Sequence, residues 1–221
     1  MFKRISTSLA ILAISISAHA TLIDFTDAKW KTAINGNTVA VLSDASFGQI
    51  TLTASGGNFS FNDSTGEKSG CAASTGGSLL ACGGDGIGIG NDEISELNRT
   101  QSNPQSITVS FDTGPVDINN IYLLDLFADD NGVSGRNETA VITTGSDTFY
   151  FTATSSATGG FYDTGFYGNN ISSIILSGNA DWFSDYALAG IEISPVPIPG
   201  AAILFGSALL GFFGFKRRRT I

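Results

Sequence analysis

The middle of the chain consists of short segments in which apolar and polar residues alternate. In Ser106–Phe111, the residues Ile107, Val109 and Phe111 share one parity, and hydroxyl-bearing residues occupy the other. A period of two places the apolar residues on one face, as in a half-buried β-strand. Similar segments predict strands at 38–42, 49–54, 58–61, 118–128, 139–143, 148–152, 172–176 and 187–193. Residues 121–127 are apolar at both parities except Asp125, which indicates a central strand covered on both faces.

The predicted strands are separated by Gly, Asn, Asp and Ser, the residues that favour tight turns. Many short strands with turns between them predict an all-β fold, an antiparallel β-sandwich forming one domain. A short helix is predicted near residues 27–33. Residues 66–103 show little periodicity, and a loop of that length in a compact domain is usually functional or disordered.

The first twenty residues have the three parts of a secretory signal peptide. Lys3 and Arg4 precede an apolar run over 5–16, and Ala18 and Ala20 flank His19 in a small-residue cleavage site. The apolar run spans about 18 Å as a helix, which is too short for the roughly 30 Å hydrocarbon core of a bilayer. We therefore expect residues 1–20 to be removed during export.

Residues 195–219 form a second distinctive end. Residues 196–215 carry no charge, and two prolines confine any helix to the stretch from about Gly200 onward. A short apolar span followed by four cations predicts a C-terminal transmembrane helix whose basic end stays in the cytoplasm. The basic residues are Lys216, Arg217, Arg218 and Arg219. The expected organisation is a signal peptide (1–20), an ectodomain (21–194) and the tail (195–219).

This tail resembles the PEP-CTERM sorting signal of Gram-negative bacteria, in its V-P-x-P variety. The matching motif is Val196, Pro197, Ile198 and Pro199, followed by the apolar span and the basic cluster. The resemblance implies cleavage near the motif by a membrane-embedded protease called exosortase. It also implies an inner-membrane-anchored precursor that is then sorted to the cell surface or the extracellular space. Residues 85–97, 103–127 and 184–194 look like segments of PEP-CTERM ectodomains, which implies a jelly-roll-like sandwich.

Charge and composition exclude several functions. Residues 21–195 contain all twenty Asp and Glu but five basic residues, a net charge of −15, against −9 for the whole chain. Such a surface repels phosphate backbones, so nucleic-acid binding is disfavoured. It also repels anionic polysaccharide unless a divalent cation bridges the two. The one histidine, His19, lies in the predicted signal peptide, which removes Ser-His-Asp and Cys-His catalysis from the mature chain. We therefore expect a protein that is not an enzyme.

The segment 66–103 holds two further candidate features. Cys71 and Cys82 are the two cysteines of the chain, and in an oxidising compartment such a pair predicts a disulfide. Carboxylates are also concentrated there. The candidate calcium ligands are Asp85, Asp92, Glu93 and Glu96. Calcium accepts irregular sets of oxygen ligands. A calcium site and a solvated acidic loop both remain open.

Aromatic residues suggest a third feature. Residues 160–168 repeat a Phe-Tyr pair across a glycine, and Trp182 follows nearby. Tyr162, Tyr167 and Trp182 would stack on sugar rings if exposed, or pack the sandwich core if buried. Two functions follow from these observations. The first is an extracellular protein of the envelope or biofilm matrix without enzymatic activity, and the alternative is a carbohydrate-binding module for exopolysaccharide with calcium as a candidate cofactor.

Overall fold

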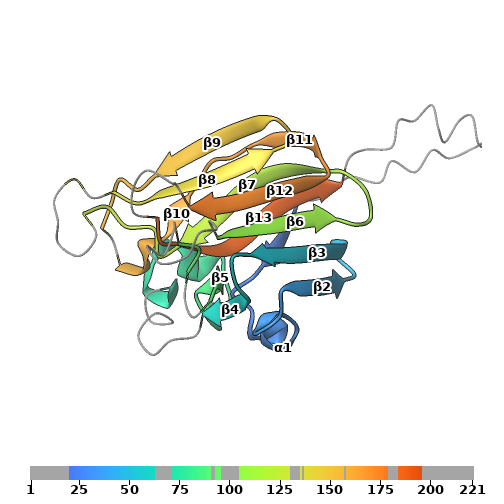
Figure 1. The fold of residues 1–221 in the computed structure, drawn as a ribbon, viewed down its shortest axis with the longest axis horizontal. Helices are drawn as coiled ribbons and strands as arrows, with labels where there is room; N and C mark the ends of the chain where they lie inside the picture. Colours follow the sequence, from blue (N-terminus) through green and yellow to red (C-terminus); the bar gives the residue numbers. More distant parts are fainter. Residues whose placement is uncertain are drawn as a thin grey trace, which may run out of the picture.

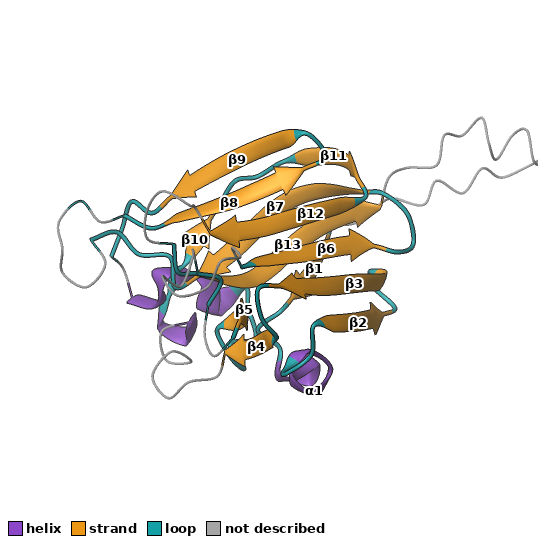
Figure 2. Cartoon of the chain, in the orientation of Figure 1, coloured by secondary structure: helices purple, strands orange, loops and turns teal. Residues whose placement is uncertain are grey.

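The computed structural model describes residues 20–62, 71–90, 93–95, 105–129, 135, 137–156, 158–178 and 184–195. Over these residues the chain forms two antiparallel sheets, one of six strands and one of seven, which lie in two layers (Figures 1 and 2). The apolar residues of both sheets meet in one buried cluster. The prediction of an all-β antiparallel sandwich is therefore confirmed.

The six-stranded sheet has the order β2-β3-β6-β12-β8-β9. Its strands are β2 (Val39–Asp44), β3 (Gly48–Ser55), β6 (Ser106–Phe111), β12 (Ser173–Gly178), β8 (Thr139–Thr144) and β9 (Asp147–Thr152). Neighbouring strands are joined by short turns in β2-β3 and β8-β9 and by long connections elsewhere. The sheet therefore assembles segments from the whole length of the domain.

The seven-stranded sheet follows the path β10-β7-β13-β5-β4, with β1 paired to β13 and β11 paired to β7. Its strands are β1 (Thr21–Asp24), β4 (Phe59–Asn62), β5 (Gly86–Ile89), β7 (Val116–Leu124), β10 (Tyr162–Asp163), β11 (Gly168–Ile171) and β13 (Ala187–Pro195). The helical pieces are α1 (Lys31–Ile34) and the 3₁₀ helices η1 (Ala28–Trp30), η2 (Thr75–Ser78) and η4 (Thr158–Gly160).

Every predicted strand has a counterpart, but the prediction for 118–128 is wrong at its C-terminal end. β7 stops at Leu124 because Asp125 adopts a left-handed backbone conformation with φ of 58°. The Asp125 N–H then donates to the carbonyl of Gly159 at 3.1 Å, outside the ladder of the sheet. The predicted helix at 27–33 appears as η1 followed by α1, and the Asp27 carboxylate caps it by accepting from the Lys29 N–H at 3.0 Å.

The core between the sheets follows the alternation of the strands. Ile107, Val109 and Phe111 of β6 are buried, and alternate residues are likewise buried in β2 and β3. Tyr186 is the largest side chain fully enclosed there, and its hydroxyl donates to the carbonyl of Ser177 at 2.8 Å. Burial raises the pKa of Tyr186 well above its ordinary value, because an ionised phenolate would be desolvated.

A second buried cluster lies on the other face of the seven-stranded sheet. It contains Cys71, Leu80, Tyr122, Leu124 and Ala189, so the segment between the cysteines covers that face. The opposite parity of β7, Ile121 and Leu123, points into the main core. Residues 121–124 are therefore covered on both sides, as the sequence predicted.

Among the described residues, no helix is long and apolar enough to span a membrane. The predicted signal peptide up to residue 19 and the predicted transmembrane span within 196–221 lie outside the described residues. Both therefore stay predictions.

Candidate functional site

Four polar side chains on the outer face of the seven-stranded sheet are linked in pairs. Asn120 and Tyr122 are two residues apart on β7, and the strand pairing places Glu192 of β13 opposite Asn120 and Asp163 of β10 opposite Tyr122. The Tyr122 hydroxyl donates to Oε2 of Glu192 at 3.1 Å. Nδ2 of Asn120 donates to Oδ1 of Asp163 at 2.6 Å. We call these four residues the polar cluster.

The turn after β10 fixes one side of the polar cluster. The Thr164 hydroxyl donates to the carbonyl of Ile121 at 2.8 Å, and the Gly165 N–H donates to Oδ1 of Asp163 at 3.1 Å. Oδ1 of Asn120 accepts from the Ile121 N–H at 2.9 Å, which orients its amide nitrogen toward Asp163. The side chains are therefore held in place by backbone groups rather than left free to rotate.

Burial and the two carboxylates control the ionisation of Tyr122. Burial raises the pKa of the Tyr122 hydroxyl, and the negative charges of Glu192 and Asp163 raise it further. The physical cause is that a phenolate here would be poorly hydrated and would stand beside two anions. Tyr122 therefore remains a neutral hydrogen-bond donor at neutral pH.

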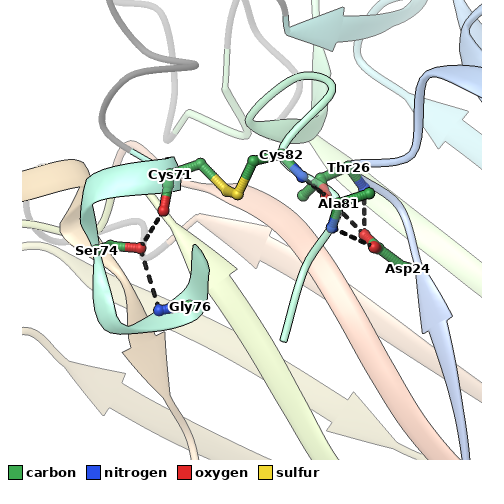
Figure 3. Close-up of a disulfide and its surroundings, with 7 residues drawn as sticks. All are labelled: Asp24, Thr26, Cys71, Ser74, Gly76, Ala81 and Cys82. Atoms are coloured by element: carbon green, nitrogen blue, oxygen red, sulfur yellow. Dashed lines mark hydrogen bonds between the residues drawn. A yellow bond between two sulfur atoms is a disulfide. The ribbon is translucent and has the colours of Figure 1, made fainter. Parts of the chain in front are cut away.

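An aromatic pair and a disulfide border the polar cluster. The rings of Tyr122 and Phe161 are stacked, with centroids 5.9 Å apart and an interplanar angle of 18°. Phe161 and Cys82 pack against the buried cluster that contains Tyr122 and Cys71. Cys71 and Cys82 form a disulfide, which confirms the prediction from the sequence (Figure 3).

The segment from Cys71 to Cys82, which we call the disulfide segment, is also joined by hydrogen bonds to the start of the domain (Figure 3). Oδ2 of Asp24 accepts from the Ala81 N–H at 2.7 Å, and Oγ1 of Thr26 accepts from the Cys82 N–H at 2.9 Å. The Thr26 hydroxyl in turn donates to Oδ1 of Asp24 at 2.6 Å. The covering segment is therefore joined to β1 independently of the sulfur atoms.

Inside the disulfide segment, Ser74 closes a tight turn. Its hydroxyl donates to the carbonyl of Cys71 at 2.6 Å and accepts from the Gly76 N–H at 3.2 Å (Figure 3). A Cβ atom on Gly77 would lie 2.5 Å from the carbonyl oxygen of Ala72, so the turn requires glycine there. The segment between the two cysteines thus contains a compact turn.

The structure separates the two predicted calcium ligands that it describes. Asp85 immediately precedes β5, and the Glu93 carbonyl accepts from the N–H of Ile89 at the far end of that strand. Four residues of strand extend about 13 Å. Both side chains are buried. Asp92 and Glu96 lie outside the described residues. Within the described ranges, no three His, Cys, Asp or Glu side chains are grouped to hold a metal ion, and the calcium site stays a prediction.

The two candidate sugar-stacking residues that the structure describes differ in exposure. Tyr162 is half-buried and packs against the main core, whereas Tyr167 is 64% exposed and its hydroxyl donates to Asn169 at 2.7 Å. Trp182 lies outside the described residues. Phe161, which the sequence did not single out, is the residue of the repeat that borders the polar cluster.

The residues that the sequence analysis missed are Asn120, Tyr122, Asp163 and Glu192. One signal was present: Asn119 and Asn120 interrupt an apolar strand, and polar residues in such a strand need partners when the sheet is covered. Their partners could not be found, because β10 and β13 are distant in sequence.

The sorting motif at 196–199 and the basic cluster at 216–219 lie outside the described residues. No family model matches this chain, and neither a curated protein nor a solved structure matches it.

Proposed function

We propose that this chain is an exported extracellular protein of the envelope or biofilm matrix, without enzymatic activity. Its supporting observation is the Cys71–Cys82 disulfide, because disulfides persist in oxidising compartments outside the cytoplasm. This support is independent of the sequence motifs at the two ends. The acidic composition of the domain, which keeps copies soluble and apart from nucleic acid, agrees with the same proposal.

In this proposal, the precursor is held in the inner membrane by a transmembrane helix that begins near Gly200. An exosortase-type protease then cuts near Val196-Pro197-Ile198-Pro199, where the prolines keep the chain extended. The released sandwich, which we propose to be jelly-roll-like, reaches the cell surface or the extracellular space. The antiparallel pairing throughout both described sheets supports that architecture.

The test is the intact mass of the protein recovered outside the cell. We expect a species that lacks residues 1–20 and the basic cluster at 216–219. Replacing Pro197 and Pro199 with alanine should leave the precursor in the membrane fraction, whereas Pro115→Ala, which alters a proline of the domain, should not. A secreted species that retains Phe215 and the arginines would refute the processing proposal.

A second candidate function is a carbohydrate-binding module, and the polar cluster favours it. Two carboxylates, an amide and a phenolic hydroxyl are held on one sheet face beside the stacked ring of Phe161. Sugar hydroxyls are both donors and acceptors, and aromatic rings pack on the apolar faces of sugar rings. Exopolysaccharide is therefore the ligand class that this candidate predicts.

A glycan array, run with and without calcium, separates the two functions. Under the second candidate, Asp163→Asn and Glu192→Gln should abolish or sharply weaken binding, because each removes the charge of one acceptor. Asp112→Asn is the matched control, because the Asp112 carboxylate accepts from the side chains of Gln49 and Thr51, which lie on the six-stranded sheet. An array without signal in both conditions would eliminate the carbohydrate-binding candidate and leave the first proposal standing.

A further inference from the structure

The six-stranded sheet ends in an open edge at β9. β9 pairs with β8 in unbroken register from Thr139–Thr152 to Thr144–Asp147 and lies at the margin of the sheet (Figure 1). In an antiparallel strand, alternate residues direct their N–H and C=O groups away from the paired neighbour. Within the described part of the chain, no strand pairs with that side of β9.

β9 lacks the features by which proteins usually protect an edge strand. Its sequence, DTFYFT, has no Lys or Pro, its pairing has no bulge, and its one charge is Asp147 at the first position. The edge of β4 is treated differently. There the Gly36 N–H donates to the carbonyl of Phe59 at 2.8 Å and the Phe59 N–H donates to the carbonyl of Asn37 at 2.7 Å. A loop therefore closes that edge, whereas no backbone group among the described residues bonds the outer side of β9.

The interior holds β9 in a fixed position. The ring of Phe166, which is buried, contacts Phe149 edge-on at a centroid distance of 5.2 Å and Phe151 at 6.5 Å. On the outer face, the hydroxyls of Thr139 and Thr152 are 2.9 Å apart. The edge is therefore ordered before any partner arrives, which reduces the entropy lost on pairing.

The outer face of the same sheet carries no charge at any position within its strands. The register gives the outward residues as Val39, Val41, Ser43, Gln49, Thr51, Thr53, Ser55, Ser106, Thr108, Ser110, Ser173, Ile175, Ser177, Thr139, Val141, Thr143, Thr148, Tyr150 and Thr152. The whole chain has a net charge of −9, so two copies repel each other on average. The Asp112 carboxylate accepts from Gln49 and Thr51 of β3, on the part of this face away from β9, so the repulsion is smallest at the β9 edge.

We propose that β9 pairs antiparallel with β9 of a second copy of this chain, about a two-fold axis at Tyr150. In that register, Phe149 of each copy lies opposite Phe151 of the other, and Thr148 lies opposite Thr152, so that residues of the same face meet. The two Asp147 carboxylates are six residues apart, about 20 Å, which exceeds the screening length of about 8 Å at physiological salt. The two six-stranded sheets become one continuous sheet.

The contact is small. A six-residue edge is about 20 Å long and a sheet is about 10 Å thick, so each copy contributes roughly 200 Å². Stable interfaces bury more than about 1,000 Å² in total. The pairing is therefore weak and concentration-dependent, and covalent trapping is the appropriate assay.

The experiment uses the full chain with one added cysteine. Tyr150→Cys places a thiol on the two-fold axis, where opposite Cα atoms would lie about 4.5 to 5.5 Å apart, within the range of roughly 4.4 to 6.8 Å that a disulfide spans. Val41→Cys is the matched control, because Val41 is 52% exposed on the same face at the opposite edge, against 65% for Tyr150. Cys71 and Cys82 are already paired and do not compete.

After mild oxidation, Tyr150→Cys should run at twice the monomer mass on a non-reducing gel and return to monomer in reductant, while Val41→Cys stays monomeric. In sedimentation at rising concentration, Tyr150→Lys should lose the native dimer and Val41→Lys should keep it, because a lysine blocks the edge that it occupies. Absence of cross-linking in Tyr150→Cys, equal cross-linking of both variants, or loss of the dimer in Val41→Lys would each overturn the proposal.

Discussion

The disulfide segment allows a quantitative prediction. Replacing both Cys71 and Cys82 with alanine removes a cross-link between residues separated by 11 positions. The chain-entropy model gives about 9.5 cal/mol/K for a loop of about 12 residues, which is about 3 kcal/mol at 25 °C. For a domain of 150 to 250 residues, each kcal/mol moves the Tm by about 2 to 4 °C, so the Tm should fall by about 6 to 12 °C.

The loss should be local as well as global. The bonds from Asp24 to the Ala81 N–H and from Thr26 to the Cys82 N–H do not depend on the sulfur atoms and should survive. The main core lies on the other side of the seven-stranded sheet and does not contain Cys71. We therefore expect an intact sandwich with a loosened cover between residues 72 and 80, and weaker packing around Tyr122.

The assay combines thermal unfolding with amide hydrogen exchange. Unfolding is followed by circular dichroism for the oxidised protein, the protein in reductant and the double variant. The last two should melt together, and reductant should not change the variant. Exchange should accelerate within residues 72–80 while β6 and β12 keep their protection.

Two results would refute this reasoning. If the double variant melts within about 2 °C of the oxidised protein, the cross-link does not constrain the unfolded chain as the entropy model requires. If exchange accelerates equally in β6, the segment is part of the main cooperative unit and is not a separate cover.

Two further predictions concern the backbone and the buried hydroxyls. Gly86→Ala should destabilise the fold by more than about 2 kcal/mol, because φ is +104° and a Cβ would collide with the carbonyl of Leu188. Gly145→Ala, also at positive φ but in open space, should cost about 1 to 2 kcal/mol. Equal losses of stability for the two variants in urea unfolding would contradict this prediction. In the folded chain, the pKa values of Tyr122 and Tyr186 lie above the ordinary tyrosine value of 10.0, so these residues ionise more readily in the unfolded chain. Their contribution to the free energy of unfolding is therefore complete below pH 10.0 and should be lost as the pH rises above that value. A free energy of unfolding that stays constant between pH 9 and pH 11 would contradict the second prediction.

The sequence by itself determined the fold class and several strands. The alternation in Ser106–Phe111 predicted β6 at its observed bounds, because a half-buried strand must bury one parity and expose the other. The cover on both faces of residues 121–124 was also predictable from their unbroken apolar run. The disulfide followed from the presence of only two cysteines. Each of these conclusions depends on local pattern or composition alone.

The sequence did not predict β5. Its sequence, GIGI, has a low strand propensity because glycine favours no extended conformation and packs no side chain. β5 forms because β4 pairs with all four of its residues and because Ile87 and Ile89 are buried in the main core. β4 and the residues of the main core belong to segments that are distant from β5 in the chain, so no local pattern could reveal the strand.

Only the tertiary structure decided the location of the candidate site and of the open edge. The polar cluster requires β7, β10 and β13 to be neighbours, and the register of those pairings places Asn120 opposite Glu192 and Tyr122 opposite Asp163. A shift of one residue would have turned these side chains to the other face. Likewise, DTFYFT predicts a strand wherever it occurs, but only the order of the sheet makes β9 its last strand. Local alternation therefore specifies which residues are extended, whereas the choice of neighbours, which depends on contacts between distant segments, specifies which groups are left for a ligand or a second copy.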